Sequence, residues 1–285
     1  MVALVFTWVS VGQTGAELRI AEQGQITTRF NTAVSHLGSQ SLDLRLGGIY
    51  ALERIMQDSP RDQPRVIAVL SAYVRTHAPV PADGFAEMDL FEIPPPPDTD
   101  VAAATEVLAE RPPGKDGRAR IDWQEADLRS LRLQSRQGFT KRDLPADLYL
   151  PFGFAALRGA DLRRAIIVGV DLHGAWCVSA NMAGAYLSDV NLKDAKMPFV
   201  DLNGAELRQA NLRGADLSRA TLVGTRLKGA DLRKADLRKA DLHGADLSSA
   251  HLEGANLADA DLTGVDLTGA HLDQAKGIPA ELLDR

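Results

Sequence analysis

The residues that could most readily do chemistry in this chain are six histidines and one cysteine. Among the histidines, only His251 and His271 form a notable pair, because the spacing between them recurs throughout this region. A zinc site needs a third and usually a fourth ligand, and Asp231 is the sole further candidate at the same spacing. We therefore expect two solvated surface histidines, with no bound metal and no cofactor.

Catalytic signatures are absent from the sequence: there is no Ser/His/Asp signature, phosphate-binding loop or Cys-x-x-Cys motif. Cys177 takes a position that leucine holds in neighbouring segments, so we expect a buried, inert thiol. A single cysteine excludes an internal disulfide and fits a reducing compartment. The frequent aspartates recur at one fixed position of a repeat, which indicates a structural role. The sequence favours a non-catalytic protein.

A five-residue repeat begins at Ala155 and dominates the rest of the chain. From Leu157 to Leu272, every fifth residue is apolar, and 20 of these 24 positions are leucine. Two residues before each, 19 of 24 positions are alanine, and the position between them is Asp or Asn in 14 of 24. The repeat is therefore A-[D/N]-L-x-x, and a search for such internal periods precedes every other assignment of fold.

A period of five matches neither a helix nor a simple strand, so we expect a chain that turns a corner every five residues. Four such repeats make the four sides of one coil, with Leu and Ala pointing inward and the two x positions outward. Asp or Asn can bond to the turn backbone. Glycine, which holds the fifth position in 12 of 24 repeats, suits a turn with positive φ.

These repeats resemble the pentapeptide repeat family over about Ile121–Ala275. The resemblance implies an all-β solenoid, a right-handed quadrilateral parallel β-helix, which here follows an α-helical N-terminal module. Some relatives are quinolone-resistance proteins that mimic duplex DNA and bind type II topoisomerases, and others have no assigned activity.

The chain divides into four predicted parts. Residues 1–77 form the helical module, and residues 78–120 form a Pro-rich linker with one short helix near 100–110. Residues 121–278 form the β-helix with an insertion near 134–151, where the leucine register breaks, and residues 279–285 cap its open end. In the module, the expected buried positions are Leu44, Ile49, Leu52, Ile55, Val66, Val69, Leu70 and Val74.

The first residues, Met1–Val11, form an apolar run that is too short to span a bilayer, which needs about 20 residues. Two interpretations stay open: the buried start of a helix, or the end of a membrane anchor. The helical module is similar to one that follows membrane spans in some bacterial relatives. We expect a cytoplasmic protein, with membrane association as the alternative.

Charge argues against a DNA mimic along most of the predicted rod. Residues 152–250 contain 11 acidic and 14 basic residues, and only residues 251–285 are acidic, with seven against two. A mimic of DNA needs a continuous negative face. Lys193, Arg213 and Arg233 instead form a basic stripe on one face. It is either a solvated surface or a binding surface for an acidic partner.

Outward positions between residues 166 and 199 are unusually apolar. We expect Ile166 and Tyr186 in one stack with Trp176 beside them, and Val178 and Phe199 nearby. Exposed apolar clusters normally mark an interface. Either the N-terminal helices or the insertion cover these residues, or an unidentified protein partner binds there with Trp176 and Tyr186 as anchors. The sequence thus favours a non-catalytic interaction scaffold, and the alternative is an inhibitor that binds DNA gyrase or another type II topoisomerase.

Overall fold

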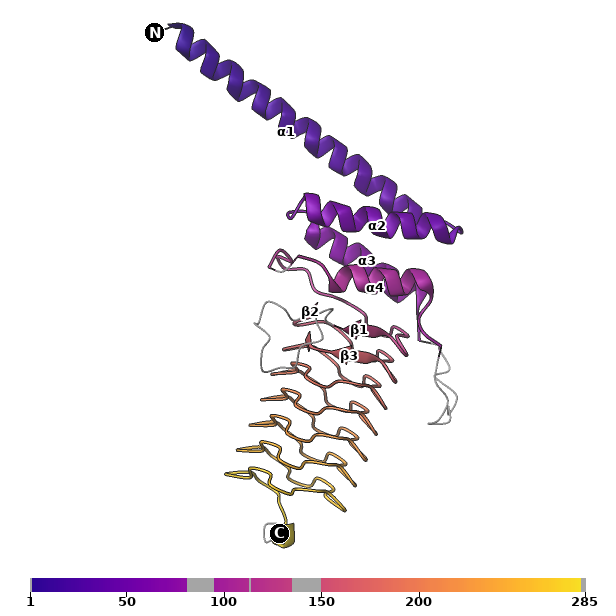
Figure 1. The fold of residues 1–285 in the computed structure, drawn as a ribbon, viewed down its shortest axis with the longest axis vertical. Helices are drawn as coiled ribbons and strands as arrows, with labels where there is room; N and C mark the ends of the chain where they lie inside the picture. The colour runs from indigo at the N-terminus through magenta and orange to yellow at the C-terminus, as the bar shows by residue number, and fades with distance from the viewer. Residues whose placement is uncertain (1, 81–94, 113, 135–149, 283–285) are drawn as a thin grey trace.

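The structure is a computed structural model that describes residues 2–80, 95–112, 114–134 and 150–282. Four helices come first: α1 (Val2–Leu37), α2 (Leu42–Asp58), α3 (Gln63–His77) and α4 (Thr99–Ala109). They stack on one end of a long coil, and the far end of α1 projects away from the rest of the molecule (Figure 1). The two chain ends therefore lie at opposite ends of the molecule.

The helices pack through the apolar stripes that the sequence predicts, with two exceptions. Ile49, Leu52, Ile55, Val66, Leu70 and Val74 are fully buried, whereas Val69 is half-buried and Leu44 is 46% exposed. Leu44 lies in the first turn of α2, and its side chain lines a surface hollow between α1 and α2 instead of the core.

Helix α4 belongs to the helical module in the structure, although the sequence places it within a linker. It packs on α2 and α3 and buries Val101, Ala104 and Leu108. Its buried Asp100 accepts hydrogen bonds from Arg45 of α2 at 2.5 Å and from Tyr73 of α3 at 2.6 Å. Burial and the neighbouring Asp100 carboxylate raise the pKa of Tyr73. A buried charge needs such partners, so this contact fixes α4 between the other two helices.

Parallel bridges join the residue at the Asp or Asn position of each repeat to the same position four repeats later, from Ala156↔Trp176 to Asn256↔Lys276. Residues that are joined in this way form a column along the coil. Each repeat contributes one bridge, so the chain returns above itself once per four repeats. The inward alanines and leucines are buried along nearly the whole coil, with exposed fractions of 0–3% from Ala155 to Leu257. Only the C-terminal end of the coil is partly open, at Ala260 and from Leu267 onward.

The corners that contain an Asp or Asn are stabilised by it, as predicted. All 14 of these residues accept a hydrogen bond from the backbone N–H two residues later, at 2.9–3.3 Å. The fifth residue of every repeat from Gly159 to Gln274 has a positive φ of 54–71°. The turn thus satisfies its own polar groups locally, which a narrow coil requires.

The first coil is longer than the others. Strand β1 (Arg132–Gln134) pairs with β3 (Ile166–Val168), and Arg132 is the partner of Ile166. Strand β2 (Leu150–Pro151) pairs with β4 (Val170–Asp171), and Leu150 is the partner of Val170, at the usual spacing of four repeats. The larger separation of the first pair reflects the extra residues between β1 and β2, where the sequence places an insertion, and residues 135–149 lie outside the described part.

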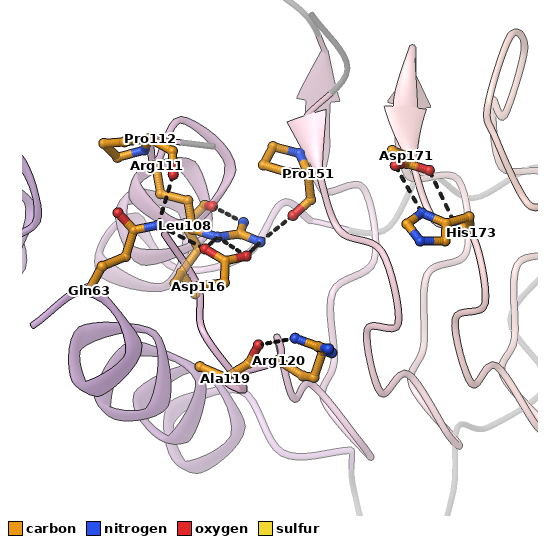
Figure 2. A network of polar contacts seen from close by, with 10 residues as sticks. All are labelled: Gln63, Leu108, Arg111, Pro112, Asp116, Ala119, Arg120, Pro151, Asp171 and His173. Carbon is orange, nitrogen blue, oxygen red and sulfur yellow. Dashed lines mark hydrogen bonds and ion pairs between the residues drawn. The ribbon is translucent and has the colours of Figure 1, made fainter. Parts of the chain in front are cut away.

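The helices cover the N-terminal end of the coil, where Trp123 and Phe152 are buried with their rings 5.1 Å apart. Buried Arg111, just after α4, stacks over Phe152, bonds to Asp116 and donates to the carbonyls of Leu108 and Pro151 (Figure 2). In the same network, Gln63 of α3 donates to Asp116 at 2.7 Å and to Pro112 at 2.8 Å. Arg111, Asp116 and the Gln63 amide nitrogen thereby satisfy one another at a buried junction. Gln63 Oε1 and Trp123 Nε1 are also buried there and have no hydrogen-bond partner among the described residues.

The segment that follows α3 pairs with the exposed edge of the first coil. Pro79 forms an antiparallel bridge with Ala126, and Val80 and Asp127 donate backbone bonds to Glu125 and Ala78. An open coil end is an unpaired sheet edge, and such edges recruit other chains. This segment therefore occupies hydrogen-bonding groups that would otherwise face solvent.

At the C-terminal end, Ala280–Leu282 form a 3₁₀ turn after Pro279. Leu282 is half-buried beside Leu262 and Val265, and Leu283 lies outside the described residues. At the other chain end, α1 begins at Val2, so the apolar run up to Val11 is part of this helix. Among the described residues, none of the helices combines the length and the apolarity that a membrane span requires.

Candidate interaction surface

The bridges sort the outward residues into four columns, and this corrects the predicted apolar cluster. Ile166 and Tyr186 share one column, as expected. Trp176 belongs to the column of Ala156 and Lys196, which is two repeats, or half a coil, away. Trp176 therefore does not lie beside Tyr186, and the residues expected to form one cluster belong to two separate surfaces.

The larger surface is an aromatic patch made of Phe154, Trp176, Val178 and Phe199. Trp176 is 62% exposed and Phe199 is 53% exposed, while Val178 is half-buried in the same repeat as Trp176. Phe199 ends the repeat that contains Lys196, one coil beyond Trp176. Large aromatic side chains in this arrangement are typical of the centre of a protein interface.

Phe154 was not predicted from the sequence because it precedes the regular repeats. It is 49% exposed and lies against Gly174, two residues before Trp176. Its ring contacts His173 edge-on at 4.7 Å and carries the guanidinium of Arg120 at 5.4 Å. Arg219 similarly lies 5.5 Å from the centre of the Phe199 ring. Both arginines lie at the rim of the patch, where each guanidinium group is attracted to the face of an aromatic ring.

The smaller surface is formed by Ile166 and Tyr186. Tyr186 is 55% exposed, whereas Ile166 is half-buried within β3. One ring and one partly covered aliphatic side chain make a smaller apolar surface than the aromatic patch.

The N-terminal helices do not cover these residues, and residues 135–149 of the insertion, which were the other expected cover, lie outside the described part. Trp176, Tyr186 and Phe199 all stay more than half exposed, and the helices lie at the end of the coil and not along its sides (Figure 1). Folding the helices onto the coil sides would uncover Trp123 and Phe152, which they bury at its end.

The basic stripe of Lys193, Arg213 and Arg233 occupies the side next to the aromatic patch. Lys193 and Arg213 are exposed, and Lys193 lies 3.9 Å from Asp194. Arg233 is held by Asp231 at 2.5 Å. Burial alone would raise the pKa of Asp231, but the bonds and the charge from Arg233 outweigh burial and lower it. Part of the stripe is thus compensated, while Lys193 and Arg213 keep exposed side chains.

Charge is distributed unevenly around the coil. The two adjoining sides made of residues 190–199, 210–219 and 230–239 contain eight basic and four acidic residues. The other two sides, residues 200–209, 220–229 and 240–249, contain three basic and four acidic residues. The half of the circumference that includes Phe199 and the basic stripe is therefore the positive one.

Cys177 is fully buried, and burial raises its pKa to about 12. The reactive form of cysteine is the thiolate, so this thiol is inert in the folded chain, in agreement with its place in the leucine column.

Comparison with known families matches eight copies of the pentapeptide repeat over residues 177–209, 210–248 and 240–276. The coil of four repeats and its buried Ala and Leu columns agree with that match. The chain belongs to the pentapeptide repeat family. Pentapeptide repeats fold as right-handed β-helices, and proteins of this family are generally scaffolds or interaction proteins and not enzymes. A search of curated proteins finds no match.

Several solved structures of pentapeptide repeat proteins are similar to this chain. A protein of the Arabidopsis thaliana thylakoid lumen is 34% identical, over 33% of this chain and 65% of its own, with a TM-score of 0.32. HetL of Nostoc, involved in heterocyst differentiation regulation, is 32% identical over 55% and 84%, with a TM-score of 0.21. QnrB1, a plasmid-mediated fluoroquinolone resistance protein, is 21% identical over 47% and 82%, with a TM-score of 0.28. The chain spans just under two thirds of the Arabidopsis protein.

Proposed function

We propose that this pentapeptide repeat protein is a non-catalytic scaffold whose aromatic patch and adjacent basic stripe bind an acidic protein partner. The observation that carries the proposal is the exposure of Trp176 and Phe199 on consecutive coils whose inward residues are fully buried. We take the coils as a closed, right-handed, four-sided solenoid, which the four bridges in every coil support.

A rigid frame strengthens such a surface. The backbone under the patch is bonded to both neighbouring coils: Trp176 donates to Ala155 of the preceding coil at 2.8 Å, and Cys177 donates to Lys196 of the following coil at 2.7 Å. Side chains on a fixed backbone lose less conformational entropy on binding, so more of the contact energy remains as affinity. Trp, Tyr and Arg dominate interface energetics, and the patch supplies Trp176 together with Arg219 at its rim.

The charge around the patch favours an acidic partner. The more basic half of the coil, which includes Phe199, has three exposed basic residues: Lys193, Lys196 and Arg213. Opposite charges steer association and add specificity more than affinity. Binding should therefore be faster at low ionic strength and should keep a salt-independent part that comes from the aromatic rings.

The test is an affinity capture from bacterial lysate and membrane fractions with the full chain, followed by binding measurements with the captured protein. Trp176→Ala should weaken that binding by about 2 kcal/mol or more, as expected for an interface hot spot. Tyr186→Ala is the matched control, because it removes a similarly exposed ring half a coil away. Equal losses for both variants, or a loss only for Tyr186→Ala, would overturn the assignment of the aromatic patch.

The topoisomerase alternative is tested in the same experiment. Recovery of gyrase subunits, with inhibited DNA supercoiling, would replace the scaffold by a DNA mimic that uses the acidic residues 251–285. We place the protein in the cytoplasm, which the unpaired Cys177 supports, with attachment to membranes through α1 as the alternative. Recovery of the chain in washed membranes, and its loss after removal of residues 1–11, would establish attachment.

A further inference from the structure

We propose that His251, Glu253 and His271 form a binding site for one divalent transition-metal ion, with Zn²⁺ as the ion that their ligand types suit. The site lies on the side of the coil that contains the basic stripe, one coil beyond Arg233, where Glu253 takes the place of the basic residues. It is separate from the aromatic patch, and it does not depend on the proposed scaffold function.

The coil itself places the two imidazoles together. His251 and His271 form a parallel bridge in consecutive coils, and the backbone bonds of His271 to Ala250 and of Leu252 to His271 measure 2.9 and 2.8 Å. The rings are stacked with centroids 4.6 Å apart and planes 4° apart. Both histidines replace the Asp or Asn that caps the corner elsewhere, so neither ring is needed for the turn.

Glu253 supplies the third ligand, for which spacing in the sequence offered only Asp231 as a candidate. Its Oε1 lies 3.3 Å from His251 Nδ1, and its Oε2 is shielded from solvent and has no hydrogen-bond partner among the described residues. Asp231 is instead engaged by Arg233. The sequence contains the signal for this arrangement: His-Leu-Glu at 251–253 is followed one coil later by His-Leu-Asp at 271–273.

The ligand atoms of the three residues all lie within 4.8 Å of one another. Bond lengths of about 2.0–2.1 Å around tetrahedral Zn²⁺ bring ligand atoms to roughly 3.4 Å from one another. Rotation of the two histidine side chains, one half-buried and one exposed, can shorten the distances between ligand atoms by this amount. The rings must leave their parallel stack so that a nitrogen lone pair of each ring points to the ion. Two imidazoles and one carboxylate then leave a fourth position for water.

A metal at this position would join the last coil to the one before it. That part of the coil is the least covered, since Leu267 and Leu272 are only partly buried. A ligand that binds only the folded state raises stability by mass action. Zn²⁺ should therefore raise the thermal midpoint of the protein, and a chelator should reverse the rise.

The experiment is a calorimetric titration of the full chain with Zn²⁺, together with Co²⁺ absorption spectra and melting curves. We expect one ion per chain, a visible Co²⁺ band of a site with nitrogen and oxygen ligands, and a loss of affinity of about tenfold or more in His251→Gln, His271→Gln and Glu253→Gln. His243→Gln is the matched control, because His243 is exposed on another side of the coil. It should leave binding unchanged.

The variants change surface side chains, so their far-UV circular dichroism should match that of the parent chain and separate lost binding from lost folding. Unchanged Zn²⁺ affinity in His271→Gln, or an equal loss in His243→Gln, would overturn the site. One ion per two chains, with a doubled mass in light scattering, would also overturn it, because it would show that histidines of two molecules share the metal.

Discussion

At the scale of the residue, the fifth position of each repeat is set by backbone conformation and not by side-chain chemistry. All 24 such positions have positive φ, and 12 of them are not glycine, including Arg219, Lys239 and Phe199. An L-residue with a side chain costs roughly 1–2 kcal/mol in this region. The coil therefore accepts this cost at half of its corners, where the fifth residue carries a charged, aromatic or other polar side chain.

A substitution at Gly244 would measure the conformational cost without steric clashes, because a Cβ added there would meet no atom within 4 Å. We expect Gly244→Val to lower the free energy of unfolding by about 1–2 kcal/mol, since a β-branched residue is strained at a φ of +64°. Gly244→Asn should cost less, because asparagine tolerates this region. Urea unfolding followed by circular dichroism measures both. Equal stability of the valine variant and the parent would show that the corner relaxes.

At the scale of the element, the repeated corner is a titratable unit. Asp261 and Asp266 accept backbone N–H bonds from Thr263 and Thr268 at 2.9 Å each, and these threonines also bond through their side chains. The bonds lower the pKa of both carboxyls below the ordinary value, the side-chain bond being the larger cause. A lowered folded-state pKa contributes stability that is present above the unfolded-state value and is lost as the pH falls through the folded-state value.

The C-terminal coils should therefore loosen in acid, below about pH 4. We expect the double change Asp261→Asn and Asp266→Asn to flatten the dependence of the melting temperature on pH across the acid range. Asparagine keeps the acceptor oxygen, as Asn256 does in the native chain, but does not titrate. Asp273→Asn is the control, because none of the described backbone bonds ends on the Asp273 side chain. An unchanged pH profile in the double variant would exclude these corners as the acid-sensitive groups.

The coil could be predicted from the sequence because each of its contacts repeats after every four repeats. The inward leucines, the Asp and Asn corners and the buried Cys177 all follow from that period. The period also excludes Trp176 from the column of Tyr186, since residues two repeats apart lie half a coil from each other. In contrast, the exposure of Leu44 and the burial of α4 depend on how the helices pack against one another. No local sequence pattern predicts that packing. Glu253 was missed because only spacings of one full coil were considered.

At the scale of the whole molecule, the helices act as a cover for one end of the coil. They bury Trp123 and Phe152, place Arg111 over the Phe152 ring, and the segment after α3 pairs with Ala126 at the first open edge. The opposite end has only the Ala280–Leu282 turn in the described structure. The two ends therefore differ in how well they are protected from other chains.

Removal of residues 1–110 should uncover that edge and its aromatic side chains, at a cost of about 1.5–3 kcal/mol for each large apolar side chain that becomes exposed. We expect a lower melting temperature and self-association, because the unpaired backbone groups of the first coil can pair with another chain. Size-exclusion chromatography with light scattering measures the mass. Removal of residues 1–19 is the control, since Ile26, Phe30, Ala33 and Leu37, through which α1 packs on the core, all remain. If the chain without residues 1–110 stays monomeric and equally stable, the coil protects its own end and the helices serve another purpose.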